Sequence, residues 1–280
     1  MLGEHAEAED VVQDAFLRWN AALATTHIED DRAYLRTTVT RLCIDRMRSA
    51  RARREVYVGP WLPEPLVTAR GEDPEAEVTL ADDVSFALLL ALERLSALER
   101  AAFLLHDVMG VPFAEIAATL ERSEDAVRQL AARAREHVRE PRARRTLGRQ
   151  EASRLRGAFA AAIRNEDLAA LQQLLADDVV FVSDSGGKVP SAMVPVTGPD
   201  RVGRMLIGIS RKAPAGTTFE AAAINGSPGF ILADVNGIFQ TVALDIAGDR
   251  IAGIYVTRNP DKLRAISRQA TPQDTRGSPR

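Results

Sequence analysis

Residues 112–135, PFAEIAATLERSEDAVRQLAARAR, are the stretch from which the rest of the chain can be interpreted. Its first half has the i, i+3, i+4, i+7 spacing of one apolar helix face, formed by Phe113, Ile116, Ala117 and Leu120. Pro112 is suited to the first helical position, where a missing N–H costs nothing. Ser123 is suited to cap a second helix that begins with Glu124 and Asp125.

The second helix has its own apolar face, formed by Val127, Leu130, Ala131 and Ala134. Arg128, Gln129 and Arg133 point elsewhere, with donors suited to phosphates and base edges. This pattern predicts a helix-turn-helix, whose second helix enters the DNA major groove. An ordinary helical hairpin also fits this pattern. The turn at 121–122 lacks the glycine that is common in a helix-turn-helix, and the acidic pair at 124–125 would repel phosphates. A carboxylate can, however, accept a hydrogen bond from cytosine N4.

Positive charge is concentrated in two segments, although the 280 residues together carry a formal net charge of −3. Residues 31–56 hold eight arginines against three acids, and residues 122–149 hold nine against four. These segments are either polyanion-binding patches or solvated surfaces. Cys43 is the only cysteine, which excludes a disulfide framework and a zinc ribbon and favours a reducing cytoplasm. We expect no cofactor, metal site or membrane span.

Two further amphipathic helices are predicted before these elements. Residues 6–24 have an apolar stripe of Val12, Phe16, Trp19 and Leu23 and an acidic stripe of Glu7, Asp10 and Asp14. The acidic stripe is either solvated or a docking face for a basic partner. Residues 32–54 place Thr37, Arg41, Arg48 and Arg51 on one face, which suits phosphates, and Tyr34 could stack on an unpaired base.

The remaining segments differ in character. Prolines and glycines in 57–81 exclude a continuous helix or a central strand, and we expect a stiff linker with Trp61 anchored on a neighbouring domain. Residues 82–140 predict four short helices that Pro141 ends. Residues 150–263 combine helices with an antiparallel meander, which indicates an α+β domain. The histidines lie outside that domain, so its candidates for acid–base chemistry are Asp184, Asp234 and Asp245.

Two blocks together resemble a known family. The first block is similar to region 2 of an extracytoplasmic-function (ECF) RNA polymerase sigma factor, and it consists of AEAEDVVQDAFLRW (6–19) and the 32–54 helix. The second block is similar to region 4 and begins at Leu92 with LERLSALER. The resemblance implies a non-enzymatic initiation factor that binds the β and β′ subunits of core polymerase and promoter DNA. Family members carry a further helix before the position of Met1, so region 2 is expected to be partial.

The resemblance also implies roles for particular positions. Core polymerase would be bound by Asp10, Val11, Gln13 and Asp14. The −10 element would be read by Thr37, Arg41, Arg48 and Arg51. The −35 element would be read by Arg122, Glu124, Asp125, Arg128, Gln129 and Arg133.

Three short motifs resemble those of a sigma-factor group with a fused SnoaL-like, NTF2-like cone: WLPEP (61–65), DSGGK (184–188) and NPDKL (259–263). Ser185 stands where that group usually has glycine. In that group the extension regulates the sigma domains, so a regulatory role is implied for Trp61, Leu62, Pro63, Glu64, Pro65, Asp184, Gly186, Gly187, Lys188, Asn259, Pro260, Asp261 and Lys262. The cone also suggests a pocket for a small-molecule ligand.

The expected chain is therefore multidomain, with two all-α domains followed by an α+β cone. Its expected divisions are 1–56 (partial region 2), 57–81 (linker), 82–140 (region 4), 141–149 (linker), 150–263 (cone) and 264–280 (disordered tail). Two alternatives stay open at this point. One is a stand-alone helix-turn-helix regulator that senses a small ligand, and the other is a SnoaL-like enzyme with attached DNA-binding domains.

Overall fold

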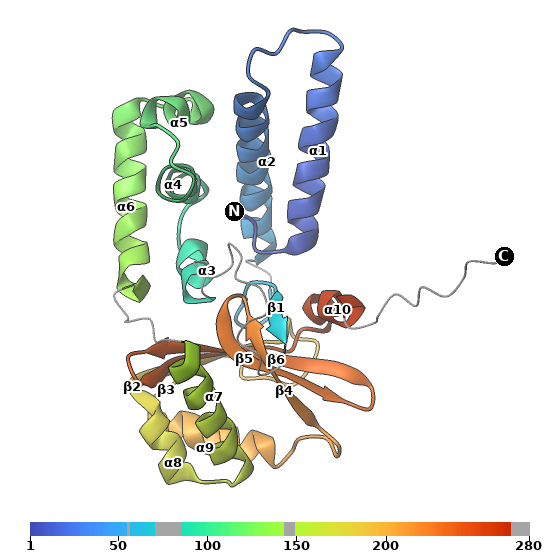
Figure 1. Ribbon diagram of the computed structural model, residues 1–280, viewed down its shortest axis with the longest axis vertical. Helices are drawn as coiled ribbons and strands as arrows, with labels where there is room; N and C mark the ends of the chain where they lie inside the picture. The colour runs from blue at the N-terminus through green and yellow to red at the C-terminus, as the bar shows by residue number, and fades with distance from the viewer. Residues whose placement is uncertain (55–56, 71–85, 143–148, 270–280) are drawn as a thin grey trace, which may run out of the picture. The chain divides into compact units, whose positions relative to one another are not determined.

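The chain forms two compact units in this computed structural model, which describes residues 1–54, 57–70, 86–142 and 149–269 (Figure 1). One unit combines Met1–Val56 with Ala87–Ala143, and the other combines Tyr57–Phe86 with Arg144–Arg280. The two predicted helical domains thus share one unit, and the beginning of the predicted linker belongs to the C-terminal unit. The start of the helix expected from residue 82 lies outside the described residues.

The first two helices of the helical unit, α1 (His5–Leu23) and α2 (Asp31–Arg54), lie side by side (Figure 1). Their buried contact consists of Val11, Ala15, Leu42 and Cys43. The apolar stripe expected on this helix is not its buried face, because Val12, Phe16 and Leu23 are about half exposed. The small side chain of Ala15 allows close approach of α2, so the helix turns its Val11–Ala15 ridge inward, one residue away from the expected stripe.

The rest of this unit consists of α3 (Phe86–Glu93) from its second residue on, α4 (Ala97–Phe103), the π-helix η2 (Leu104–Val108), α5 (Phe113–Leu120) and α6 (Glu124–Arg142). Ser96 and Glu99 form a capping box at the start of α4. α6 continues past Pro141, contrary to the expected stop at that residue.

The α5–α6 turn is made without glycine. Glu121 takes a left-handed conformation (φ 54°), and the Arg122 backbone N–H donates to the Ala117 carbonyl at 3.0 Å. Ser123 then caps α6 as expected, since its hydroxyl accepts from the Ala126 N–H at 3.2 Å. Pro112 lies at the N-cap of α5, one position before the place expected for it.

The C-terminal unit contains a seven-stranded sheet in the order β1-β4-β5-β6-β7-β2-β3. The strands are β1 (Val67–Arg70), β2 (Leu175–Asp184), β3 (Val196–Thr197), β4 (Thr218–Ile224), β5 (Ser227–Asp234), β6 (Gly237–Ala247) and β7 (Arg250–Thr257). The meander from β4 to β7 is antiparallel as expected, whereas β2 pairs with β7 in parallel. The linker contributes β1 at the sheet edge, which agrees with the exclusion of a central strand.

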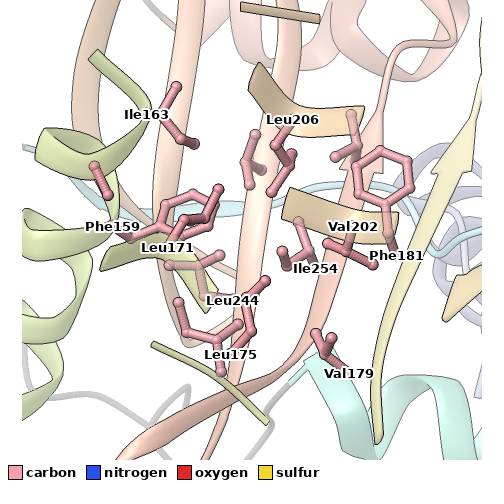
Figure 2. Packing of buried hydrophobic residues seen from close by; sticks show 14 of the residues in the cluster. Phe159, Ile163, Leu171, Leu175, Val179, Phe181, Val202, Leu206, Leu244 and Ile254 are labelled. Atoms are coloured by element: carbon pink, nitrogen blue, oxygen red, sulfur yellow. The ribbon is translucent and has the colours of Figure 1, made fainter. Parts of the chain in front are cut away.

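Helices α7 (Arg149–Arg164), α8 (Leu168–Leu174) and α9 (Pro199–Ser210) cover one face of this sheet (Figure 1). Figure 2 shows Phe159, Leu171 and Val202 of the helices meeting Leu244 and Ile254 of the strands. These side chains fill the space between the helices and the sheet, so the packing is that of the expected α+β cone.

The last helix, α10 (Pro260–Gln269), corrects part of the expected tail. Residues 264–269 were predicted to be disordered, but they continue this helix, and Ile266 is 1% exposed. Residues 270–280 lie outside the described residues. No helix in the described ranges has both the length and the apolar content to cross a membrane.

Gly229 on β5 is the sharpest packing constraint in the sheet, because an added Cβ would lie 2.0 Å from the Val242 carbonyl oxygen. We expect Gly229→Ala to lower the free energy of unfolding by about 2–4 kcal/mol, as measured by chemical denaturation. Gly157 on α7 is the matched control, since an added Cβ there meets no atom within 4 Å and alanine favours a helix. Equal stability of the two variants would contradict this view of the β5–β6 pairing.

Candidate nucleic-acid interface and linker anchor

Asp184, at the end of β2, lies at the centre of a buried linker anchor. It is 0% exposed and accepts hydrogen bonds from the Tyr57 hydroxyl at 2.6 Å, the Leu62 N–H at 2.9 Å and the Gly186 N–H at 3.1 Å. The Lys262 ammonium donates to the same carboxylate at 2.7 Å. Four donors occupy the acceptor sites of this group, so the carboxylate binds the linker and has no lone pair directed at a substrate.

Lys262 completes this anchor from α10. Its side chain is 7% exposed, and its ammonium also donates to the Leu62 carbonyl. The same ammonium lies 4.1 Å from the centroid of the Trp61 ring and 5.5 Å from that of Tyr57. Trp61 is therefore anchored as expected, and it is held within the C-terminal unit.

Two glycines of the 184–188 motif allow the linker to approach. Both Gly186 and Gly187 have positive φ. A Cβ added at Gly186 would lie 2.7 Å from the Asn259 amide nitrogen, and one added at Gly187 would lie 2.8 Å from the Val58 side chain. Asn259 in turn donates to the Tyr57 hydroxyl at 2.8 Å. Ser185 does not have a positive φ, which explains why this position accepts serine.

The other residues of the three motifs divide into buried linker residues and an exposed ion pair. Leu62, Pro63 and Pro65 are buried, whereas Glu64 is partly exposed. Lys188 forms an exposed ion pair with Asp261, and this hydrogen bond lowers the pKa of Asp261 below its usual value. Pro260 is exposed and begins α10.

Asn225 is a linker-binding residue that the sequence analysis missed. Its side-chain oxygen accepts from the Leu66 N–H at 2.6 Å, and its amide donates to the Glu64 carbonyl at 3.1 Å. Phe86, which also belongs to this unit, stacks on Tyr255 with ring centroids 5.0 Å apart. The Asn-Gly pair at 225–226 is typical of a tight turn. Its sequence does not indicate that the Asn225 side chain also binds the linker, because that role depends on the linker lying beside the turn.

The candidate −35 residues occupy the exposed side of α6 and the turn before it. Arg122, Asp125 and Gln129 are exposed. Glu124 forms an ion pair with Arg128, and Arg133 donates to Glu99 of α4 at 3.0 Å. Partial burial alone would raise the pKa of Glu99, but hydrogen bonds from Ser96 and Arg133 outweigh it and lower that pKa. The N-terminal half of α6 thus presents mixed donors and acceptors to solvent.

The candidate −10 residues on α2 are not all free in this structure. The Thr37 hydroxyl lies 3.2 Å from that of Thr119 on α5. Arg41 donates to the Thr119 carbonyl at 3.3 Å and to the Glu121 carboxylate at 2.8 Å. Arg36, one turn before, forms an ion pair with Glu115. The first helix of the helix-turn-helix therefore already engages part of the basic face of α2.

The same face of α2 also has an exposed arginine and a hollow at its N-terminal half. Arg48 is exposed and lies 3.8 Å from Asp45, whereas the Arg51 side chain lies outside the described residues. An open hollow of about 520 Å³ lies at the N-terminal half of α2. It is lined by Arg18, Ala33, Tyr34, Thr37, Thr38 and Arg41. Its basic and hydroxyl groups suit a phosphate, and Tyr34 supplies an aromatic ring.

The candidate docking residues of α1 separate into two groups. Asp10 is exposed and Asp14 is partly exposed, and they accept from Arg46 at 3.1 and 3.2 Å, while Gln13 is exposed. Val11 is 1% exposed because it packs against α2, so it belongs to the helix core and not to a docking surface. The exposed face of α1 instead contains Val12 and Phe16.

Comparison with known proteins identifies two parts of the chain by family models and nearly the whole length by relatives. Residues 1–53 match the family model described as Sigma-70 region 2, and residues 85–138 match the one described as Sigma-70, region 4. The chain is 40% identical over 274 residues to the ECF RNA polymerase sigma factor SigJ of Mycobacterium tuberculosis, a match that covers 94% of this chain and 87% of that protein. It is 35% identical over 271 residues to a probable ECF sigma factor, SigI, of the same species, covering 95% and 90%.

A solved structure is similar over the same length. The crystal structure of Mycobacterium tuberculosis SigJ is 37% identical and superposes with a TM-score of 0.74, covering 94% of this chain and 91% of that chain. The similarity extends through both the helical part and the C-terminal sheet.

Asp184→Asn should release the linker from the C-terminal unit, because it leaves the Lys262 ammonium buried without its counter-charge. We expect a loss of about 3–5 kcal/mol of stability in that unit. In a Trp19→Phe background, Trp61 fluorescence should shift to the red as its ring enters water. Asp177→Asn is the control, since Asp177 is 97% exposed. Unchanged Trp61 emission in Asp184→Asn would show that the carboxylate does not hold the linker.

Proposed function

Since the chain belongs to the family of ECF RNA polymerase sigma factors, which bind core polymerase and direct it to promoters, we propose how its residues divide that work. The function is one of binding: two helical regions recognise DNA and polymerase, and the fused C-terminal domain modulates them. Because core polymerase acts in the cytoplasm, we expect the chain there as well.

The −35 element is assigned to the N-terminal half of α6. The observation that carries this assignment is the exposed row of Arg128, Gln129 and Asp125 on a helix whose opposite side is buried in a helix-turn-helix core. A recognition helix reads base edges with residues near its N-terminus. Arg133 is a weaker candidate for this role, because its guanidinium must leave Glu99 to reach DNA.

The −10 element is assigned to α2 and to the hollow beside Tyr34. An unpaired base could stack on the Tyr34 ring while Arg18 and Arg41 neutralise its phosphates. Arg48 extends the basic face along the helix. This site suits a separated strand better than a duplex, because stacking on the Tyr34 ring requires a base that is free of its partner.

Core polymerase is assigned to the exposed face of α1. This face combines Asp10, Gln13 and Asp14 with the exposed apolar side chains of Val12 and Phe16. Apolar side chains rimmed by charge are typical of a protein–protein interface. Arg46 holds the two carboxylates in place and gives the face a defined shape.

Modulation by the C-terminal domain is assigned to the linker anchor. Asp184, Lys262 and Asn225 hold residues 57–66 in one conformation. These residues connect the two helical regions along the chain, so the anchor restricts the conformations that polymerase can select when it binds both. Release of the anchor should therefore favour polymerase binding.

Run-off transcription with core polymerase tests the assignment as a whole. We expect a promoter-specific transcript from the full chain, and tighter binding of core polymerase by Asp184→Asn and by a chain ending at residue 148. A footprint on DNA without polymerase would support a stand-alone regulator instead. An enzymatic turnover that the full chain shows and Asp184→Asn lacks would support the alternative of a SnoaL-like enzyme. Identical polymerase affinity in all three proteins would contradict the proposed role of the anchor.

The contacts between α2 and α5 should compete with promoter DNA for Arg36 and Arg41. We expect the double variant Glu115→Gln/Glu121→Gln to raise transcript yield about two- to fivefold, because two exposed ion pairs are removed. Glu29→Gln/Glu151→Gln removes the same charge from exposed positions that take no part in these pairs. An equal gain in that control would attribute the effect to net charge and would contradict the competition.

A further inference from the structure

Three side chains from consecutive elements of the helix-turn-helix meet at Phe113, the first residue of α5. The His106 ring of η2 stacks on the Phe113 ring, with centroids 3.8 Å apart and an interplanar angle of 26°. The Arg128 guanidinium of α6 lies over the same ring, 4.6 Å from its centroid. The His106 Nδ1 donates to the Val111 carbonyl at 3.0 Å, which fixes the imidazole beside the ring.

Arg128 is held from a second direction as well. Its Nη2 donates to the Glu124 carboxylate one turn earlier on α6. This pair uses one N–H of the guanidinium and leaves further donors of the fork for another acceptor. The side chain remains 54% exposed, so it is restrained and still accessible from solvent.

The other described arginines of α6 are restrained in a different way. Arg133 pairs with Glu99 of α4, and Arg135 pairs with Asp107 of η2 at 2.7 Å. Both carboxylates belong to neighbouring helices, so these pairs draw the two arginines toward the protein. Arg128 pairs with a residue of α6 itself and lies on an aromatic face, and it is nearer the N-terminus of the helix.

We propose that Phe113, backed by His106, and Glu124 are positioning residues that orient the Arg128 guanidinium to read a guanine in the −35 element. A planar guanidinium can donate two parallel hydrogen bonds to O6 and N7 of guanine. An arginine that is already ordered loses less side-chain freedom when it binds. The inference rests on the proposed role of α6 at the −35 element, and it adds the residues that set its specificity.

The test measures base preference with the full chain and core polymerase. Transcript yield is compared across promoters that carry each of the four base pairs at every −35 position. We expect the unmodified chain to prefer guanine at one position and Arg128→Ala to abolish that preference. Phe113→Leu, which keeps an apolar side chain without a π face, should reduce the preference about two- to fivefold, and Phe113→Tyr should restore it.

Base preference separates positioning from stability. A purely structural role for Phe113 would lower yield from all promoters equally, and that result would overturn the proposal. An unchanged preference in Phe113→Leu, together with its loss in Arg128→Ala, would also overturn the positioning role while leaving Arg128 as a reader. If the unmodified chain shows no preference at any −35 position, the assignment of α6 to this element fails first, and the proposal fails with it.

Discussion

The C-terminal unit binds the linker through the buried ion pair between Asp184 and Lys262. A carboxylate and an ammonium removed from water are costly unless every remaining donor and acceptor is satisfied. Here the linker satisfies them, through the Tyr57 hydroxyl and both backbone groups of Leu62. The pair and the linker therefore support each other, because the linker supplies hydrogen bonds that the buried charges need and the charges hold the linker. This coupling makes the linker part of a domain core.

A second constraint is that several DNA-binding candidates already have protein partners. Arg41 is engaged by Glu121, and Arg128 by Glu124 and Phe113. The two cases differ in consequence. The contact of Arg41 must be broken to free its guanidinium, whereas that of Arg128 leaves donors available and restricts their direction. The structure thus closes part of the candidate −10 face on α2 and keeps a candidate −35 residue on α6 ordered.

The local sequence pattern predicted most helices and strands. Tertiary packing decided which of their residues are buried and which distant residues meet. The helix-turn-helix, the cap at Ser123 and the meander from β4 to β7 follow from periodicity and turn chemistry, which act over a few residues. The buried face of α1 does not follow from periodicity, because packing against α2 buries Val11 and leaves Val12 exposed. Asn225 and Tyr57 joined the anchor through contacts more than a hundred residues apart in sequence, which no local pattern encodes.

The position of β1 has a consequence for any state in which the linker leaves the sheet. β1 pairs with the last three residues of β4, 222–224, and covers that part of the sheet edge. Departure of the linker uncovers the backbone groups of these residues, and such edges pair readily with strands of other chains. A form of the protein in which the linker has left the sheet would therefore be prone to self-association, and prompt capture of the uncovered edge by a partner would favour its solubility.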